Sequence, residues 1–177
     1  MTNIETVSIP LAGGLQLVVP AGKLADEVIK RLLNGDAPSP AVTVVPLKGV
    51  PKIGTDWPGQ GGFYAGVVRG AEGKPDYHLV LADQDKASIN WDDAMKWAKG
   101  LKIDGHEDYT LPERNEQAIL WGNVPERFEK EAYWSAAPSA GYASYAWCQD
   151  FSNGYQYSYY PKGNELRARA VRRLPIQ

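Results

Sequence analysis

The sequence predicts an α+β fold on the basis of three observations. Short runs of alternating apolar and polar residues are separated by turn signals, as in antiparallel hairpins. Two stretches keep the apolar spacing of amphipathic helices, and most tyrosines gather in one segment near the C-terminus. With 177 residues and 44% hydrophobic content, the chain can bury one good core with a small additional element.

Residues 1–46 are predicted to form a separate N-terminal element, and residues 47–177 the main domain. Residues 7–9 and 15–19 flank a Gly-Gly turn and read as a hairpin, followed by helical spacing over 24–33 and a Pro-rich linker at 37–40. Because an element of this size can scarcely bury its own apolar stripe, we expect it to dock on the main domain or on another chain. The Pro-rich spacer favours attachment or oligomerisation.

The first part of the main domain is predicted to contain a second hairpin and two helices. The hairpin pairs residues 63–68 with 77–81. One helix covers 90–98, with Asn90 as its N-cap, and the other opens at Pro112 and runs to Trp121.

Residues 133–173 form a Tyr-rich segment that is predicted to contain a third hairpin. Alternation over 146–151 places Trp147 and Phe151 on the buried face and Cys148 and Asp150 on the outward face. A Ser-Asn-Gly turn follows, and the second strand then aligns three tyrosines on one face: Tyr155, Tyr157 and Tyr159.

The composition of this segment favours a contact surface. Tyr, Ser, Gly and Asn dominate antibody paratopes, because Tyr supplies a large amphipathic contact area at low entropy cost and the small polar residues adapt their hydrogen bonds. The alternative is an ordinary Tyr-rich hairpin, since aromatic residues are common in strands.

Charge and composition exclude several classes of function. A net charge of −2 and a pI of about 5.7 give no electrostatic footprint for nucleic acid or an anionic membrane. The C-terminal arginines are expected in a last strand, with Arg167 and Arg169 on one face and Ala168 and Ala170 on the other. The N-terminus lacks the features of a signal peptide and no apolar run is long enough to span a membrane, so we expect cytoplasmic synthesis.

Neither a catalytic site nor a cofactor site is predicted. His78, His106 and Cys148 are too far apart in the sequence for a zinc site, and a catalytic role for Cys148 is disfavoured by its position within a strand. The acidic run 104–108 leaves calcium as an alternative, although it lacks the cadence of a calcium loop. We therefore expect no metal, no cofactor and no enzyme activity.

Five motifs occur in an order that resembles a known family. They are a Trp-x-x-Ala helix, Asp-Tyr-Thr-Leu-Pro at 108–112 with Glu116, Tyr-Trp-Ser at 133–135, Ala-Trp at 146–147 with Asp-Phe at 150–151 and Gly154, and Arg-Ala-Val-Arg at 169–172. Together they resemble the Lcl-type C-terminal domain family over roughly residues 57–174. The resemblance implies a C-type-lectin-like fold with two helices, short antiparallel sheets and long loops. It also implies a phage or prophage origin and similarity to variable proteins of diversity-generating retroelements.

The resemblance places the ligand-binding surface within the Tyr-rich segment. The residues it implies are Ser139, Tyr142, Ser144, Tyr145, Cys148, Asp150, Asn153, Tyr155, Tyr157 and Tyr159.

Three functions remain open at this point. The first is a noncatalytic, virion-associated receptor-binding module that recognises a bacterial surface protein or glycan, with residues 1–46 forming a homo-oligomer or binding another phage structural protein. The second is a structural adaptor or oligomeric tail component whose Tyr-rich face packs on another subunit. The third is a sugar-modifying or oxidising enzyme, because formylglycine-generating enzymes share the broad fold.

Overall fold

The computed structural model describes residues 6–10, 16–20, 49–71 and 73–176. The chain divides into two compact units, Met1–Gly49 and Val50–Gln177. In the first unit, β1 (Thr6–Pro10) and β2 (Gln16–Pro20) pair antiparallel with Val7 opposite Val19, which confirms the predicted hairpin. The predicted helix at 24–33 and the linker at 37–40 lie outside the described residues.

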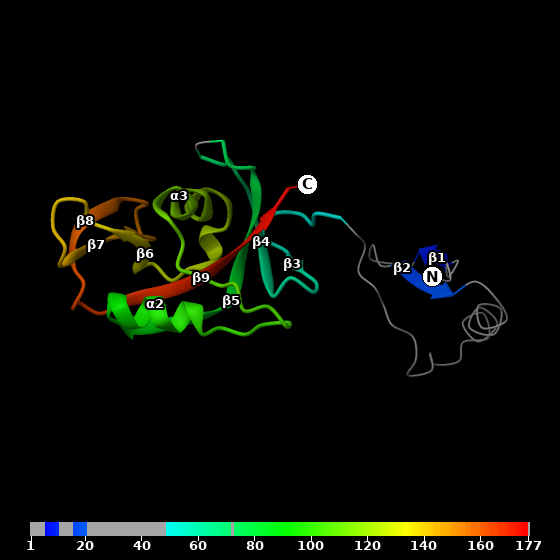
Figure 1. Ribbon diagram of the computed structural model, residues 1–177, viewed down its shortest axis with the longest axis horizontal. Helices are drawn as coiled ribbons and strands as arrows, with labels where there is room; N and C mark the ends of the chain where they lie inside the picture. The colour runs from blue at the N-terminus through cyan, green and yellow to red at the C-terminus, as the bar shows by residue number, and fades with distance from the viewer. Residues whose placement is uncertain (1–5, 11–15, 21–48, 72, 177) are drawn as a thin grey trace. The chain divides into compact units, whose positions relative to one another are not determined.

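The second unit contains a mixed seven-stranded sheet of order β3-β4-β5-β9-β6-β7-β8 (Figure 1). Its strands are β3 (Asp56–Trp57), β4 (Gly62–Val68), β5 (Tyr77–Ile89), β6 (Ala132–Pro138), β7 (Tyr145–Asp150), β8 (Gln156–Pro161) and β9 (Leu166–Pro175). The β4–β5 hairpin confirms the prediction, although β5 continues well past residue 81. All neighbours pair antiparallel except β6 and β9, which pair in parallel through Tyr133 and Arg167.

Two helices pack on this sheet, and Figure 1 shows them on opposite sides of β9. They are α2 (Trp91–Lys99) and α3 (Arg114–Asn123), and a 3₁₀ turn, η1 (Pro125–Arg127), follows α3. The α+β class is therefore observed. No helix in the described ranges is long and apolar enough to cross a membrane.

Strand β9 separates two hydrophobic cores, because successive side chains of a strand point to opposite faces. The α2 core contains Ala168 and Ala170 of β9 together with Ala94 and Ala98 of α2 and Trp134 of β6. The α3 core contains Val171 of β9 with, from other elements, Leu79, Leu81, Leu120, Tyr133 and Phe151. Both ends of the Tyr-rich segment are thus anchored in buried packing.

The helix starts follow local capping chemistry. The side chain of Asn90 accepts a hydrogen bond from the Asp93 amide at 3.0 Å, which confirms it as the N-cap of α2. Helix α3 begins at Arg114, two residues after the predicted start at Pro112, and the amide of Glu113 donates to Glu116 at 2.7 Å.

An ion pair ties α3 to β9. The carboxylate of Glu116 is fully buried and accepts from Nε and Nη2 of Arg173, each at 2.6 Å, and from the Tyr77 hydroxyl at 2.7 Å. Burial and the hydrogen bond to this carboxylate raise the pKa of Tyr77 to about 12. Because Arg173 also donates to Thr110 at 2.7 Å, the start of α3 is held from several directions.

The prediction of which side chains of residues 146–151 point into the core is wrong in part. Ala146 and Cys148 point into the α2 core and are fully buried, whereas Trp147 lies half-buried on the opposite face beneath Arg114. The reason is that β7 is an interior strand with side chains packed on both faces, so alternation alone does not identify the buried side. Phe151 follows the strand and is buried in the α3 core, as predicted.

Candidate functional site

The β7–β8 hairpin and the loop that leads into it carry the three most exposed tyrosines of the described residues. Tyr142, Tyr155 and Tyr159 keep 69%, 67% and 62% of their surface accessible. The three tyrosines predicted on one face differ in exposure, because Tyr157 is half-buried against the α2 core whereas Tyr155, directly before β8, and Tyr159 are exposed. We call Tyr142, Tyr155 and Tyr159 the exposed tyrosines.

The predicted site residues form two groups at opposite ends of the hairpin. At the open end the rings of Tyr142 and Tyr145 lie 5.7 Å apart. Tyr157 is opposite Cys148, next to the Gln149–Gln156 pair at the turn end, and its ring lies 5.6 Å from that of Tyr159. Tyr145 is opposite Pro161 in the sheet register, at the end of β8 that lies away from the turn. Tyr155 stands at the turn end, directly before β8. Four residues of extended chain, at about 3.3 Å each, separate it from Tyr159 by roughly 13 Å.

The serines of the predicted site lie at the open end. Ser144 is exposed and its carbonyl accepts from the Lys162 amide at 2.9 Å. Ser139 is half-buried and its amide donates to the Tyr145 carbonyl at the same distance. These backbone bonds close the loop that presents Tyr142.

Asp150 and Asn153 build the turn at the other end. The Asp150 carboxylate accepts from the Ser152 amide at 2.8 Å, from the Ser152 hydroxyl at 2.6 Å and from Asn153 Nδ2 at 3.1 Å. The Asn153 side chain in turn accepts from the Tyr155 amide at 2.9 Å. Asp150 is therefore half-buried and committed to the turn, and it positions Tyr155 through Asn153.

Cys148 was predicted on the ligand-binding surface, but the structure shows that this prediction is wrong. Its side chain is fully buried, and burial raises the pKa of the thiol to about 12. A thiol held protonated in this way lacks the thiolate character that a nucleophile requires.

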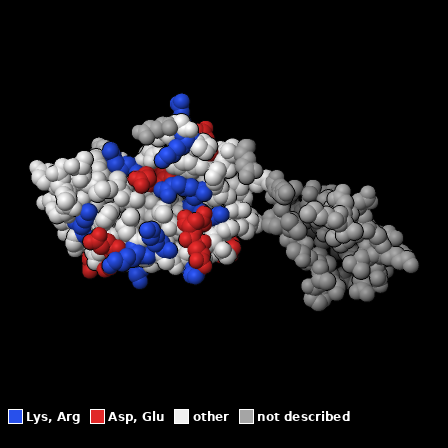
Figure 2. Space-filling view, in the orientation of Figure 1, with Lys and Arg blue, Asp and Glu red and all other residues white. Residues whose placement is uncertain are grey.

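The surface around the hairpin is poor in charge. Asp150 is the sole charged residue in the sequence from Tyr133 to Pro161. Figure 2 shows the consequence: on the face in view, the end of the molecule that holds β7 and β8 is largely free of acidic and basic side chains, whereas mixed charges cover the remainder of the unit. Such a surface suits ligands that are bound by aromatic contact and neutral hydrogen bonds.

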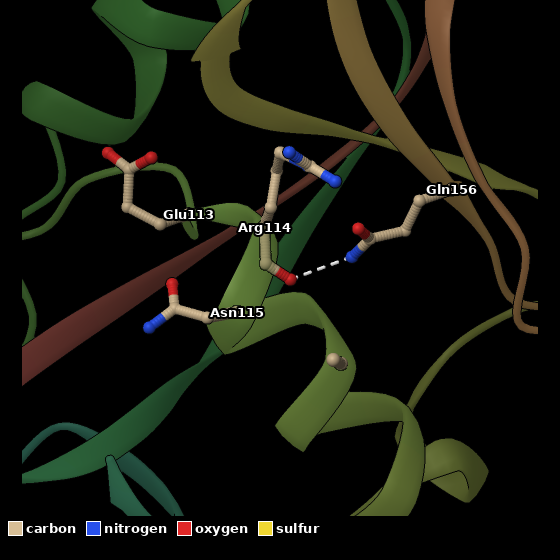
Figure 3. A pocket seen from close by; sticks show the side chains of 5 residues that line it. Glu113, Arg114, Asn115 and Gln156 are labelled. Atoms are coloured by element: carbon tan, nitrogen blue, oxygen red, sulfur yellow. Dashed lines mark hydrogen bonds between the residues drawn. The ribbon is translucent and has the colours of Figure 1, made fainter. Parts of the chain in front are cut away.

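Sequence reasoning missed a group beside the hairpin. The guanidinium of Arg114 lies 3.4 Å from the centre of the Trp147 ring, and Gln156 Nε2 donates to the Arg114 carbonyl at 2.7 Å and to Gln149 Oε1 at 2.8 Å. Of these residues, Arg114 and Gln156 border an open hollow of about 460 Å³ at the start of α3 (Figure 3). The available signal was Arg114 itself, because a cation is unfavourable in the first turn of a helix.

The possible metal ligands were compared within the described part of the chain. No group of three or more His, Cys, Asp or Glu side chains there is arranged to hold a metal ion. In the acidic 104–108 loop, Asp108 pairs with Arg172 at 2.5 Å and Glu107 with Lys102 at 2.8 Å. The backbone of the same loop is tied back by His106, whose Nε2 lies 2.8 Å from the Gly59 carbonyl oxygen.

Comparison with protein families identifies a match to this chain. The family model of the Lcl C-terminal domain matches residues 71–172, which is more than half of the chain and includes both helices and the complete Tyr-rich hairpin. A search of curated proteins finds no match to this chain. The order of motifs, the two-helix unit and the family match lead to one conclusion: the chain belongs to the Lcl C-terminal domain family.

Proposed function

We propose that this protein is a noncatalytic ligand-binding module with a C-type-lectin-like fold that recognises a bacterial surface protein or glycan through the β7–β8 hairpin. The observation that carries the proposal is the set of exposed tyrosines on a nearly uncharged hairpin. Tyr residues at the centre of an interface typically contribute upwards of about 1 kcal/mol each.

The scaffold beneath the hairpin supports a binding role. Phe151 stacks on Phe128 with ring centres 3.8 Å apart and meets Tyr133 edge-on at 5.2 Å, so the base of the turn is rigidly packed. Trp134 of β6 holds the other end, since its Nε1 donates to the Ile89 carbonyl at 2.8 Å and its ring lies 6.5 Å from that of Tyr160. A preorganised surface loses less conformational entropy on binding than a flexible one.

The sequence resemblance also supports a proposal about the origin of the gene. We infer a phage or prophage gene whose product is virion-associated, with a surface similar to those that diversity-generating retroelements rewrite. Sequencing codons 133–173 across a population that carries the gene tests this. Diversification predicts substitutions at exposed positions such as Tyr142 and Tyr159 and constancy at buried Ala146; an invariant segment would leave a fixed binding module.

The direct test is saturable binding of the labelled protein to a panel of bacterial cells, competed by unlabelled protein. The proposal predicts competed binding to a subset of strains. Binding to no strain, or binding to every strain without competition, would contradict it.

One observation favours a second function, that of a structural adaptor. Strand β8 lies at the edge of the sheet and contains no charged residue, and an uncharged edge strand is open to pairing with a strand of another subunit. Light scattering of the purified protein separates the two functions. Stable oligomers that dissociate when Tyr159 and Tyr155 are replaced by Ser would support the adaptor, whereas a monomer would favour the ligand-binding module.

A further inference from the structure

The hollow at the start of α3 has a lining unlike the rest of the hairpin surface. It is bordered by Glu113, the N-cap of α3, by Arg114, Asn115 and Ala118 of α3 and by Gln156 of β8. Its volume of about 460 Å³ lies within the range of small-molecule sites. Because Gln156 directly follows the exposed Tyr155, the hollow adjoins the proposed ligand surface.

Arg114 differs from the arginines of β9 in what its guanidinium contacts. Arg167, Arg172 and Arg173 each donate to a carboxylate. Arg114 is exposed, and among the described residues its guanidinium has no carboxylate or carbonyl acceptor; it is instead stacked 3.4 Å from the centre of the Trp147 ring. Stacking uses the face of the planar group and leaves its edge N–H donors available to an acceptor in the plane.

The position of Arg114 is not explained by helix stability. A cation in the first turn faces the positive end of the helix dipole, which costs a few tenths of a kcal/mol to about 1 kcal/mol. Figure 3 shows the Arg114 and Gln156 side chains pointing toward one another, whereas the Glu113 carboxylate points to the opposite side. The positive charge on the Gln156 side of the hollow is therefore not neutralised by its acidic neighbour.

A buried amide behind Gln156 provides a second observation. Gln149 is 1% exposed, and its Oε1 accepts from Gln156 Nε2 at 2.8 Å. Its own Nε2 is buried and has no hydrogen-bond partner in the described part of the chain. Buried donors of this kind are rarely left unsatisfied. Gln149 does not itself line the hollow, but its Oε1 holds the lining residue Gln156 from behind.

From these observations we propose that the hollow is a carboxylate-binding subsite. The edge of the stacked Arg114 guanidinium binds the carboxylate with two parallel N–H···O bonds. Oε1 of Gln156, whose Nε2 is already engaged, and the side-chain amide of Asn115 bind neighbouring polar groups of the same ligand. Bidentate Arg–carboxylate pairs are among the stronger hydrogen-bonded contacts in proteins. The subsite's place in ligand recognition rests on the proposed function, whereas its affinity for a carboxylate does not.

The test uses the full chain labelled with ¹⁵N and follows the indole N–H signal of Trp147, which W147F identifies by its loss. Two matched pairs of probes differ in a carboxylate: glucuronate against glucose, and N-acetylglutamate against N-acetylglutamine. We expect saturable shifts with the acids and not with their neutral counterparts. Binding of both acids identifies a general carboxylate subsite. Binding of glucuronate alone indicates that the carboxylate belongs to a sugar, and binding of N-acetylglutamate alone indicates that it belongs to a peptide.

Variants of Arg114 show whether the guanidinium is responsible. R114Q is expected to lower the affinity about ten- to a hundredfold, as for the loss of a charged hydrogen bond. R114K keeps the charge but loses the planar stack and the bidentate geometry, so its affinity should lie between the two. Equal shifts with acid and neutral probes, or acid binding unchanged in both variants, would overturn the proposal. Acid binding that depends on Arg114, together with no competed binding of the parent protein to any bacterial strain, would instead count against the proposed function and leave the subsite standing.

Discussion

At the scale of single residues, buried polar groups hold the site in place and were the hardest features to predict. Glu116 and Gln117 sit in a helix pattern that reads as solvated, yet both are buried. Glu116 is buried because Arg173, Tyr77 and the Glu113 amide satisfy it, and these contacts join residues far apart in the sequence. Local periodicity carries no information on such partners, so the sequence could not reveal them.

The first prediction concerns this ion pair. E116Q leaves Arg173 without its counter-charge, and should lower the free energy of unfolding by about 2–3 kcal/mol, below the value for a fully buried pair because Arg173 is 32% exposed. Urea denaturation followed by fluorescence measures the change. The control is E107Q, which breaks an exposed pair with Lys102 and should cost less than about 0.5 kcal/mol. Equal effects of the two substitutions would refute the structural role of Glu116.

A second prediction follows from Cys148. Its pKa is raised by burial from 9.0 to about 12, so between these values the unfolded chain loses a proton that the folded chain keeps. The stabilisation by the neutral thiol is complete below pH 9 and is lost as the pH rises toward 12. Unfolding free energies measured from pH 8 to pH 10 should therefore fall less steeply in C148A than in the parent. A steeper fall in C148A would contradict the assignment.

At the scale of elements, the hairpins, α2 and the last strand were predictable because their signals are local. Asn90 capping, the turn at 152–154 and the alternation of β9 each depend on neighbouring residues. The sequence did not reveal which side chains of β7 point into the α2 core, because side chains cover both faces of this strand. The small thiol of Cys148 fits the crowded face next to Trp134. The pairing of Arg114 with Trp147 also depends on tertiary packing, which places α3 against the hairpin.

The contact between the hairpin turn and α3 leads to a third prediction. Gly154 has φ of +82°, and a Cβ there would lie 2.7 Å from the Trp121 ring. G154A should cost about 1–3 kcal/mol, through overpacking and through the left-handed backbone. G141A is the matched control in the same segment, since a Cβ there meets no atom within 4 Å. Thermal unfolding of both variants gives the comparison, and equal melting temperatures would mean that Trp121 does not constrain the turn.

At the scale of the whole molecule, the chain divides at Gly49, and the Val50–Gln177 unit contains two hydrophobic cores of its own. We therefore predict that a chain beginning at Gly49 folds cooperatively. The test is a single sharp thermal transition together with dispersed amide signals in solution. An insoluble product, or a broad transition, would show that residues 1–48 complete the core of the second unit.

Binding through the exposed tyrosines is tested by measuring the cell binding of a variant that lacks all three. The triple variant Y142A/Y155A/Y159A removes aromatic surface that is more than 60% exposed at each site, so it should keep a cooperative melt and lose cell binding at least tenfold. The control is I53A/V67A, which truncates exposed apolar residues in the Ile53 loop and on β4. We expect loss of cell binding in the triple tyrosine variant and full cell binding in I53A/V67A. Full binding by a folded triple variant would contradict the account.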